Sequence, residues 1–142
     1  MKIHPTAIVH PKASLDGDVE IGPFCVIGEH VAIGKGSRLC SHVTIDGWTE
    51  IGERNEVHPF ASIGGPPQHL GYKGEPTKVI IGDDNIIREY VTINRGTVQG
   101  GGVTSLGSKG ILMAYVHVAH DCRLGNHIIM ANAASLAGHI TI

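Results

Sequence analysis

An aliphatic residue recurs at every sixth position over most of the chain. Eleven consecutive positions of this column, from Ile3 to Ile63, hold only Ile, Leu or Val. The same phase returns from Ile81 to Ile93, and after a slip of one residue it continues from Leu106 to Ile142. The position two residues before each aliphatic is mostly small or β-branched, and the position after it is often Gly, as expected where a chain turns a corner. Two inward positions per repeat, one large and one small, predict a narrow prism of short strands.

The period of six decides the fold class. An α-helix repeats every 3.6 residues and a strand every two, so neither produces it. A parallel β-helix does, because each hexapeptide forms one flat face and three faces close a coil of about 18 residues. The chain would fill roughly seven coils, stacked about 4.8 Å apart. A β-sandwich would need turn-rich gaps about every 8–12 residues, which this chain lacks. We therefore predict an all-β fold, a parallel β-helix with three faces per coil.

Two segments interrupt the period and are predicted to leave the coil. Residues 64–80, GGPPQHLGYKGEPTKVI, are rich in Pro and Gly and form the predicted external loop. Residues 94–105, NRGTVQGGGVTS, form a second irregular segment. We expect residues 1–142 to form a single domain. Because the sequence stops at the first residue of a new hexapeptide without a capping element, we expect it to be truncated there.

Composition and charge exclude several classes of protein. The formal net charge is -2, so no basic excess indicates binding to nucleic acid or to an anionic membrane. No apolar stretch approaches the roughly 20 residues of a membrane span, and the N-terminus lacks the apolar core of a signal peptide. Three cysteines without paired spacing predict reduced thiols in a cytoplasmic protein. Dinucleotide and P-loop motifs are absent, and we expect no cofactor.

The segment HVAHDC, residues 117–122, carries the candidate chemistry. His117 and His120 occupy outward positions of the repeat, because their neighbours fall in the inward columns. His139 follows His120 about one coil further along, so we expect the two side chains within about 5–8 Å of each other. This spacing gathers three histidines beside Asp121 on one outer edge of the prism.

Two kinds of site fit this group of residues. A carboxylate beside a histidine fixes the tautomer of the imidazole and raises its basicity, so His120 and Asp121 suggest a general base that removes a proton from a substrate hydroxyl. The backbone N–H at the nearby corner Gly138 is a candidate to stabilise an oxyanion. Three converging histidines also fit a zinc site, and spacing alone leaves both possibilities open. A cysteine nucleophile is disfavoured because Cys122 falls in an inward position.

Six segments of the chain are similar to motifs of one known family. They are IGPFCVIGEHVAIG (21–34), FASIG (60–64), GYKGEPT (71–77), REYVTINRGT (88–97), HVAHDCRLGN (117–126) and ANAASLAGH (131–139). In this combination the chain closely resembles the UDP-N-acetylglucosamine acyltransferases that begin lipid A synthesis in Gram-negative bacteria. The resemblance implies a left-handed coil and a homotrimer with active sites in the clefts between subunits. It also implies transfer of an (R)-3-hydroxyacyl group from acyl carrier protein to the 3-hydroxyl of UDP-N-acetylglucosamine.

The resemblance also implies roles for individual residues. His120 matches the general base of the family and Asp121 matches its orienting partner. His117 and His139 match histidines that line the cleft and help to hold substrate. In the external loop, Gln68 matches a position that contacts the sugar nucleotide, and we expect its neighbour His69 to bind substrate as well.

The chain also departs from the family pattern. The family usually has an acidic residue where this chain has His69 and a lysine where it has Gly71, and Lys73 is a candidate to replace that lysine. The family continues with further coils and a C-terminal helical domain, which the 142 residues do not include. Two alternative hypotheses therefore stay open beside the acyltransferase. One is a catalytically inactive trimeric β-helix fragment, and the other is a zinc-dependent hydratase of the carbonic-anhydrase type.

Overall fold

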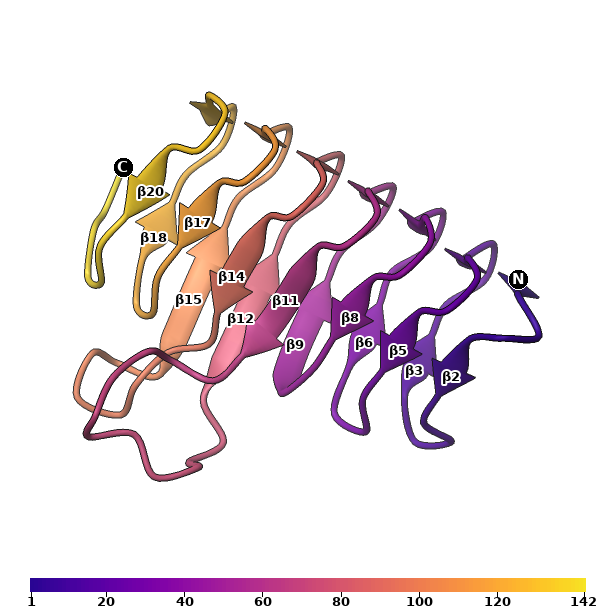
Figure 1. Cartoon of the computed structure of the whole chain (residues 1–142), viewed down its shortest axis with the longest axis horizontal. Coiled ribbons are helices and arrows are strands. Elements are labelled where there is room, and N and C mark those ends of the chain that lie inside the picture. Colours follow the sequence, from indigo (N-terminus) through magenta and orange to yellow (C-terminus); the bar gives the residue numbers. More distant parts are fainter.

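The computed structural model describes all 142 residues, which form a β-helix of twenty short strands in three parallel sheets (Figure 1). Sheet A comprises β1 (Lys2–Ile3), β4 (Glu20–Ile21), β7 (Arg38–Leu39), β10 (Glu56–Val57), β13 (Ile86–Ile87), β16 (Ile111–Leu112) and β19 (Ile129–Met130). Sheet B comprises β2 (Ile8–Val9), β5 (Val26–Ile27), β8 (Thr44–Ile45), β11 (Ser62–Gly65), β14 (Thr92–Asn94), β17 (His117–Val118) and β20 (Ser135–Leu136). Sheet C comprises β3 (Ser14–Leu15), β6 (Ala32–Ile33), β9 (Trp48–Ile51), β12 (Lys78–Ile81), β15 (Val103–Leu106) and β18 (Arg123–Leu124).

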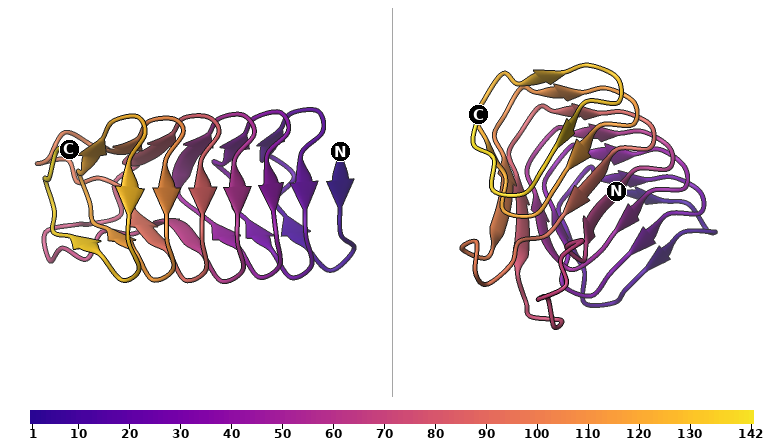
Figure 2. Two further views of the ribbon diagram at one scale, coloured as in Figure 1. Left: turned by 90° about the horizontal axis from the view of Figure 1, so that it is seen from above. Right: turned by 60° about the vertical axis from the view of Figure 1, so that its left-hand side comes forward.

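Each strand pairs with the strand three places later in the chain, so successive coils stack in register. Ile3 lies beside Ile21 and Ile21 beside Leu39, and the aliphatic column therefore forms a continuous ladder. The predicted parallel β-helix with three faces is confirmed, and its coil is left-handed. Figure 2 shows the coils stacked along one axis and their roughly triangular outline.

The core of the prism is formed by the two inward columns that the sequence predicts. Ile27, Ile45 and Ile63 are at most 1 % exposed, and the smaller residues between them, such as Val43, are equally buried. The inward columns also contain Asn55 and Asn85. Their amides are satisfied because Asn85 Nδ2 donates to Asn55 Oδ1 over 3.0 Å and to the carbonyl oxygen of Gly107 over 2.9 Å. A buried polar group with all its partners costs little stability, so the two asparagines fit the core.

The glycine column has a different physical cause from the one that its place in the repeat suggests. A Cβ at Gly34 would lie 2.6 Å from the carbonyl carbon of Gly52, so glycine is needed where adjacent coils approach each other closely. In most corners one residue has a left-handed backbone, and it lies two residues after this column. Thirteen residues other than Gly adopt a positive φ there, and Asp121 and His139 are among them. The corner itself therefore does not require glycine.

Both irregular segments leave the coil at the corner between sheets B and C (Figures 1 and 2). Residues 66–77 connect β11 to β12, and residues 95–102 connect β14 to β15. Both lie inside the ranges that the sequence marks as irregular, and the flanking residues extend the strands of sheet C to four residues. The same corner carries residues 119–122 between β17 and β18, so the loops and the histidine segment share one edge of the prism.

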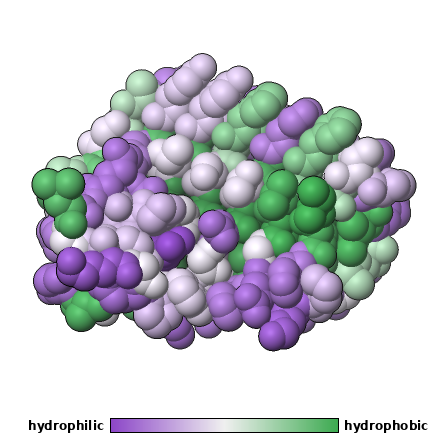
Figure 3. Space-filling view, turned by 60° about the horizontal axis from the view of Figure 1, so that its bottom comes forward, coloured by the Kyte–Doolittle hydropathy of each residue, from purple (hydrophilic) through white to green (hydrophobic).

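A row of stacked aromatic rings follows a different corner of the prism, between sheets A and B. This aromatic ladder comprises Phe24, His42, Phe60, Tyr90 and Tyr115, whose successive ring centroids lie 4.8–5.2 Å apart. In Figure 3 apolar side chains also gather over the N-terminal half of the face beside it, whereas hydrophilic side chains dominate the C-terminal half near the loops. The ladder is exposed, with Tyr115 61 % accessible. None of the structure's elements is a helix of the length and apolarity needed to cross a membrane.

Candidate functional site

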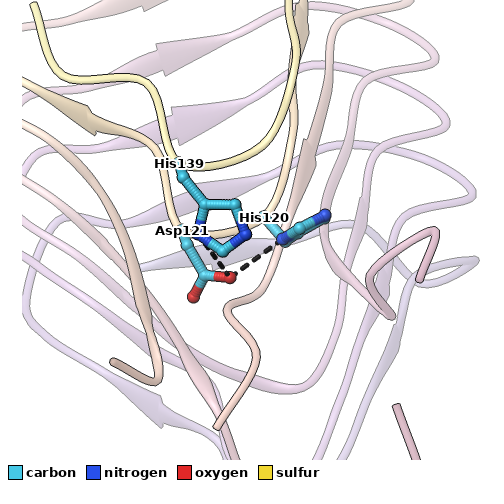
Figure 4. Close-up of side chains that lie close together, drawn as sticks. All are labelled: His120, Asp121 and His139. Carbon is cyan, nitrogen blue, oxygen red and sulfur yellow. Dashed lines mark hydrogen bonds and ion pairs between the residues drawn. The ribbon is translucent and has the colours of Figure 1, made fainter. Parts of the chain in front are cut away.

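His120 and Asp121 lie at the corner between β17 and β18 (Figure 4). The Nδ1 atom of His120 lies 2.8 Å from Oδ2 of Asp121. His120 is 9 % exposed and the Asp121 side chain is fully buried, because the external loops cover this part of the corner. A carboxylate only accepts hydrogen bonds, so Nδ1 carries the proton and Nε2 presents its lone pair. The pair has the arrangement of a general base with an orienting carboxylate.

Asp121 is held by the second loop. The backbone N–H of Thr97 donates to Oδ1 of Asp121 over 2.8 Å, and the Thr97 hydroxyl donates to Oδ2 over 2.6 Å. Burial alone would raise the pKa of Asp121, but the hydrogen bonds from Thr97 and His120 outweigh it and lower that pKa below its ordinary value. Asp121 is therefore ionised at neutral pH, and it can accept a hydrogen bond from His120.

His139 and Gly138, from the following coil, complete one side of the site. The rings of His139 and His120 meet edge to face with centroids 5.0 Å apart, as the one-coil spacing predicts, and His139 Nδ1 lies 3.7 Å from Asp121 Oδ2. A Cβ added to Gly138 would lie 2.5 Å from Cε1 of His120, so this backbone runs directly over the imidazole. The Gly138 N–H donates to no backbone acceptor and remains free for a ligand.

His117 lies on the outer face of sheet B, beside the same corner. Its Nδ1 atom is 2.6 Å from the Thr92 hydroxyl. Burial, with a smaller contribution from the neighbouring His120, lowers the pKa of His117. The ring is therefore neutral at physiological pH, and it suits hydrogen bonding to a polar ligand better than pairing with an anion.

The external loop reaches back to His120 and Asp121. The rings of His69 and His120 meet edge to face with centroids 5.2 Å apart, although the two residues lie far apart in the sequence. Gln68 and His69 are exposed, whereas the preceding Pro67 is buried and packs the loop against the coil. The structure thus brings five of the candidate residues, His69, His117, His120, Asp121 and His139, to one edge, with Gln68 next to them.

Two of the alternatives raised by the sequence can be compared with this geometry. One possible ligand atom from each of His120, Asp121 and His139 lies within 4.8 Å of the others, a separation that a metal ion can bridge. The Asp121 carboxylate, however, already accepts three hydrogen bonds from Thr97 and His120, which fill most of its acceptor sites. Cys122 is fully buried and burial raises the pKa of its thiol, so it is not placed to act as a nucleophile.

Sequence reasoning missed the residues that support the pair. Thr97 and Thr104 are both buried, and Thr104 Oγ1 accepts the backbone N–H of Asp121 over 2.8 Å. Thr97 stands in the NRGT segment, which breaks the six-residue period beside three glycines. A β-branched polar residue in such a break was the only feature of the sequence that could have indicated this supporting residue. The period alone does not indicate which loop residue meets which corner.

Comparison with known proteins agrees with this description. The model of the bacterial transferase hexapeptide family, with six repeats, matches residues 12–47. The chain is 57 % identical over 99 % of its length to an acyl-[acyl-carrier-protein]–UDP-N-acetylglucosamine O-acyltransferase from Thermodesulfovibrio yellowstonii, and 51 % identical over 97 % of its length to one from Syntrophobacter fumaroxidans. It spans only about half the length of these curated relatives, 55 % and 54 % respectively.

Solved structures match equally well. The chain superposes on LpxA from Acinetobacter baumannii with a TM-score of 0.97 at 50 % identity, covering 98 % of this chain and 54 % of that one. The UDP-N-acetylglucosamine acyltransferase of Arabidopsis gives a TM-score of 0.79 at 33 % identity, covering 98 % of this chain and 56 % of that one.

Fold and sequence together place the chain among proteins of the bacterial transferase hexapeptide class. Within that class, the chain belongs to the family of UDP-N-acetylglucosamine acyltransferases, and it corresponds to about the N-terminal 55 % of their length.

Proposed function

We propose that the chain provides the catalytic base for transfer of an (R)-3-hydroxyacyl group from acyl carrier protein to the 3-hydroxyl of UDP-N-acetylglucosamine, the first step of lipid A biosynthesis. The relatives are named for acyl carrier protein and UDP-N-acetylglucosamine, which supports these substrates. The observation that carries the proposal is the buried Thr97–Asp121–His120 chain of hydrogen bonds, which leaves Nε2 of His120 as the free base.

The proposed reaction is an acyl transfer with one proton carrier. Nε2 of His120 removes the proton from the sugar hydroxyl as its oxygen attacks the thioester carbonyl carbon. Asp121 stabilises the resulting imidazolium through Nδ1, and the free N–H of Gly138 donates to the oxyanion of the tetrahedral intermediate. The intermediate collapses when the carbon–sulfur bond breaks, and the leaving thiolate takes the proton back from His120. The products are the sugar ester and the free thiol of the carrier.

The residues around the pair are proposed to hold the sugar nucleotide. His117 and His139 flank His120 on two sides, and Gln68 and His69 approach from the external loop. His69 replaces an acidic residue of the family pattern. An imidazole donates and accepts hydrogen bonds where a carboxylate only accepts, so we expect His69 to contact the sugar through a different pair of atoms.

The test compares the chain with a chimera in which it is extended by the C-terminal part of a relative. Acyl transfer from 3-hydroxyacyl carrier protein to UDP-N-acetylglucosamine is measured for the 142 residues and for a chimera that adds the C-terminal part of the Thermodesulfovibrio yellowstonii relative. We expect turnover in the chimera and its loss by roughly a hundredfold or more in the chimera with His120→Ala, because the general base is removed. A chimera that keeps normal turnover after this substitution would disprove the role of His120.

The same pair of proteins separates the alternative functions. An active chimera beside an inactive chain would identify the 142 residues as a catalytically inactive fragment of an acyltransferase, which is one of the two alternatives that the sequence leaves open. Metal analysis and a carbon dioxide hydration assay on the same samples test the other alternative, the zinc-dependent hydratase. One bound zinc with hydratase activity, and no acyl transfer by the chimera, would replace the present proposal with a zinc-dependent hydratase.

We also propose that the chain forms a homotrimer in the cytoplasm. The exposed aromatic ladder supports association, because contiguous exposed rings commonly mark an interface between proteins. The three cysteines are unpaired, which fits a reducing compartment. Light scattering gives the mass of the particle directly, and a monomer across the concentration range would contradict the trimer.

A further inference from the structure

Much of the external loop projects into solvent. Between β11 and β12 it runs over solvent-exposed residues, including Gln68, His69 and Leu70. A segment with so much exposed backbone is mobile unless side chains anchor it. The substrate-binding role proposed above requires the opposite, because Gln68 and His69 must stay beside His120. Some contact must therefore hold the loop.

Arg95, the first residue of the second loop, contacts both the external loop and the end of β11 from which that loop starts. Its Nε donates to the Tyr72 hydroxyl over 2.7 Å, in the middle of the external loop. One terminal nitrogen donates to the carbonyl oxygen of Gly64 over 2.8 Å, where the chain enters that loop. A planar guanidinium has donors at fixed angles and can satisfy both acceptors at once, which a lysine ammonium does less well.

Two aromatic rings enclose the same guanidinium. Its carbon lies 5.6 Å from the ring centroid of Trp48 on β9 and 5.3 Å from that of Tyr72. Both distances fall within the range of a cation–π interaction, which is stronger where the cation is partly shielded from water. Arg95 thus connects the loop at Tyr72 to the coil at Trp48.

Tyr72 also contacts the second half of the external loop. Its hydroxyl donates to the backbone carbonyl oxygen of Glu75 over 2.6 Å, and the backbone N–H of Lys73 donates to the Glu75 carboxylate over 2.5 Å. The backbone N–H of Tyr72 donates to the carbonyl oxygen of His69 over 3.1 Å. The conformation of His69 is therefore linked to Arg95 through one residue, Tyr72.

We propose that Arg95 is a positioning residue that fixes the external loop and thereby places Gln68 and His69 for binding of UDP-N-acetylglucosamine. The inference rests on the proposed function for the identity of the ligand. The clamp itself, formed by Arg95, Tyr72 and Trp48, rests on the contacts alone. It assigns a role to the arginine of the NRGT segment and to the tyrosine of the GYKGEPT segment.

The experiment uses four variants of the 142-residue chain. Arg95→Met removes the donors and the charge, Arg95→Lys keeps the charge but not the fork of donors, and Tyr72→Phe removes only the hydroxyl. Arg88→Met is the control, because Arg88 is exposed and pairs only with its neighbour Glu89. Thermal unfolding of each variant shows that the coil remains folded.

The first readout is amide hydrogen exchange of residues 66–77. We expect exchange of the Tyr72 amide to accelerate by about tenfold in Tyr72→Phe and more in both Arg95 variants, because the hydrogen bonds that hold the loop are lost. The control should match the unaltered chain. Unchanged exchange in Arg95→Met would overturn the clamp, whatever the function of the protein.

The second readout is binding of UDP-N-acetylglucosamine, followed by the fluorescence of Trp48, the only tryptophan of the chain. We expect Kd to rise about tenfold or more in both Arg95 variants and less in Tyr72→Phe. If Arg95→Lys binds like the unaltered chain, charge and not positioning is responsible, and the proposal is wrong. If the unaltered chain binds no UDP-N-acetylglucosamine, the proposed function fails, while the exchange data still decide whether Arg95 holds the loop.

Discussion

At the residue scale, Asp121 shows how a carboxylate can be both buried and charged. It adopts a φ of 64°, a conformation that aspartate tolerates better than most residues. It accepts two hydrogen bonds from Thr97 and one from His120, so both carboxylate oxygens have a donor. Without these donors a buried carboxylate would take up a proton and could no longer orient the imidazole.

The first prediction concerns Thr97. Replacement by Val keeps the shape and the backbone donor but removes the hydroxyl that donates to Asp121 Oδ2. A hydrogen bond to a charged group contributes about 1.5–3 kcal/mol, so we expect turnover of the chimera to fall roughly 10- to 100-fold. Thr97→Ser retains the hydroxyl and should stay within a few-fold of the unaltered chimera. Equal activities of the Val and Ser variants would show that the hydroxyl has no positioning role.

The second prediction is the pH dependence of stability caused by Asp121. Because its pKa in the folded chain lies below the ordinary value of 3.8, the folded chain binds this proton less readily than the unfolded chain does. The stabilisation is therefore fully present above the unfolded pKa and decreases as the pH falls through the lower folded value. Urea unfolding of the unaltered chain and of Asp121→Asn should show a difference that is constant near neutral pH and shrinks in acid. A difference that grows as the pH falls would contradict this.

At the scale of elements, the corner between sheets B and C differs from the other corners in the segments that it carries. Most corners between sheets are short turns of the same shape, whereas the corner between sheets B and C carries both loops and the histidine segment. In the second loop, Thr97 contacts Asp121 and Arg95 contacts the external loop, so this loop touches both parts of the candidate site. A rigid coil with loops at one edge is a common way to position binding residues.

The third prediction tests how closely the next coil approaches the base. A methyl group at Gly138 would overlap the His120 ring, since its carbon would lie 2.5 Å from Cε1. The ring must move, and a displacement of about 1 Å in an active site costs on the order of a hundredfold in turnover. Gly17→Ala is the matched control, because no atom lies within 4 Å of the added carbon. If both variants retain equal turnover in the chimera, the close packing of Gly138 on the base has no catalytic consequence.

At the scale of the whole molecule, the prism presents one exposed edge that is rich in aromatic rings. The rings of the aromatic ladder stack on each other along the coil, so each contacts its neighbours in the coils before and after it. Their outer edges remain exposed, with Phe60 48 % accessible. The ladder lies at a different corner from the catalytic pair. A change to the ladder should therefore affect association without directly altering the base.

The fourth prediction is that Phe60→Glu weakens the proposed trimer. A carboxylate in the middle of an apolar contact must lose its water on association, which is unfavourable without a partner. We expect the mass from light scattering to shift toward the monomer at concentrations where the unaltered chain is a trimer. Ile80→Glu on sheet C, which also replaces a partly exposed apolar residue, should leave the mass unchanged. The reverse result would place the interface on sheet C.

The amino-acid sequence by itself determined the coil. Both inward columns depend on a local repeat in which Ile, Leu and Val recur at fixed spacing, and the burial of Ile27, Ile45 and Ile63 follows from that spacing. It also brought His139 near His120, because no loop lengthens the coil between β17 and β20 and Val118 pairs with Leu136 in the regular repeat. The family followed from motifs that the sequence contains.

Only the tertiary structure decided how the two loops meet the coil. Thr97 and His69 lie far from His120 in the sequence, and no period relates them, because a loop that leaves the repeat can fold back in many ways. The direction of each loop depends on contacts such as that of Arg95 with Tyr72, which join segments that no repeat relates. The histidine segment and Asp121 were predicted from spacing, but only the packing in three dimensions decided that Thr97 and Thr104 support them.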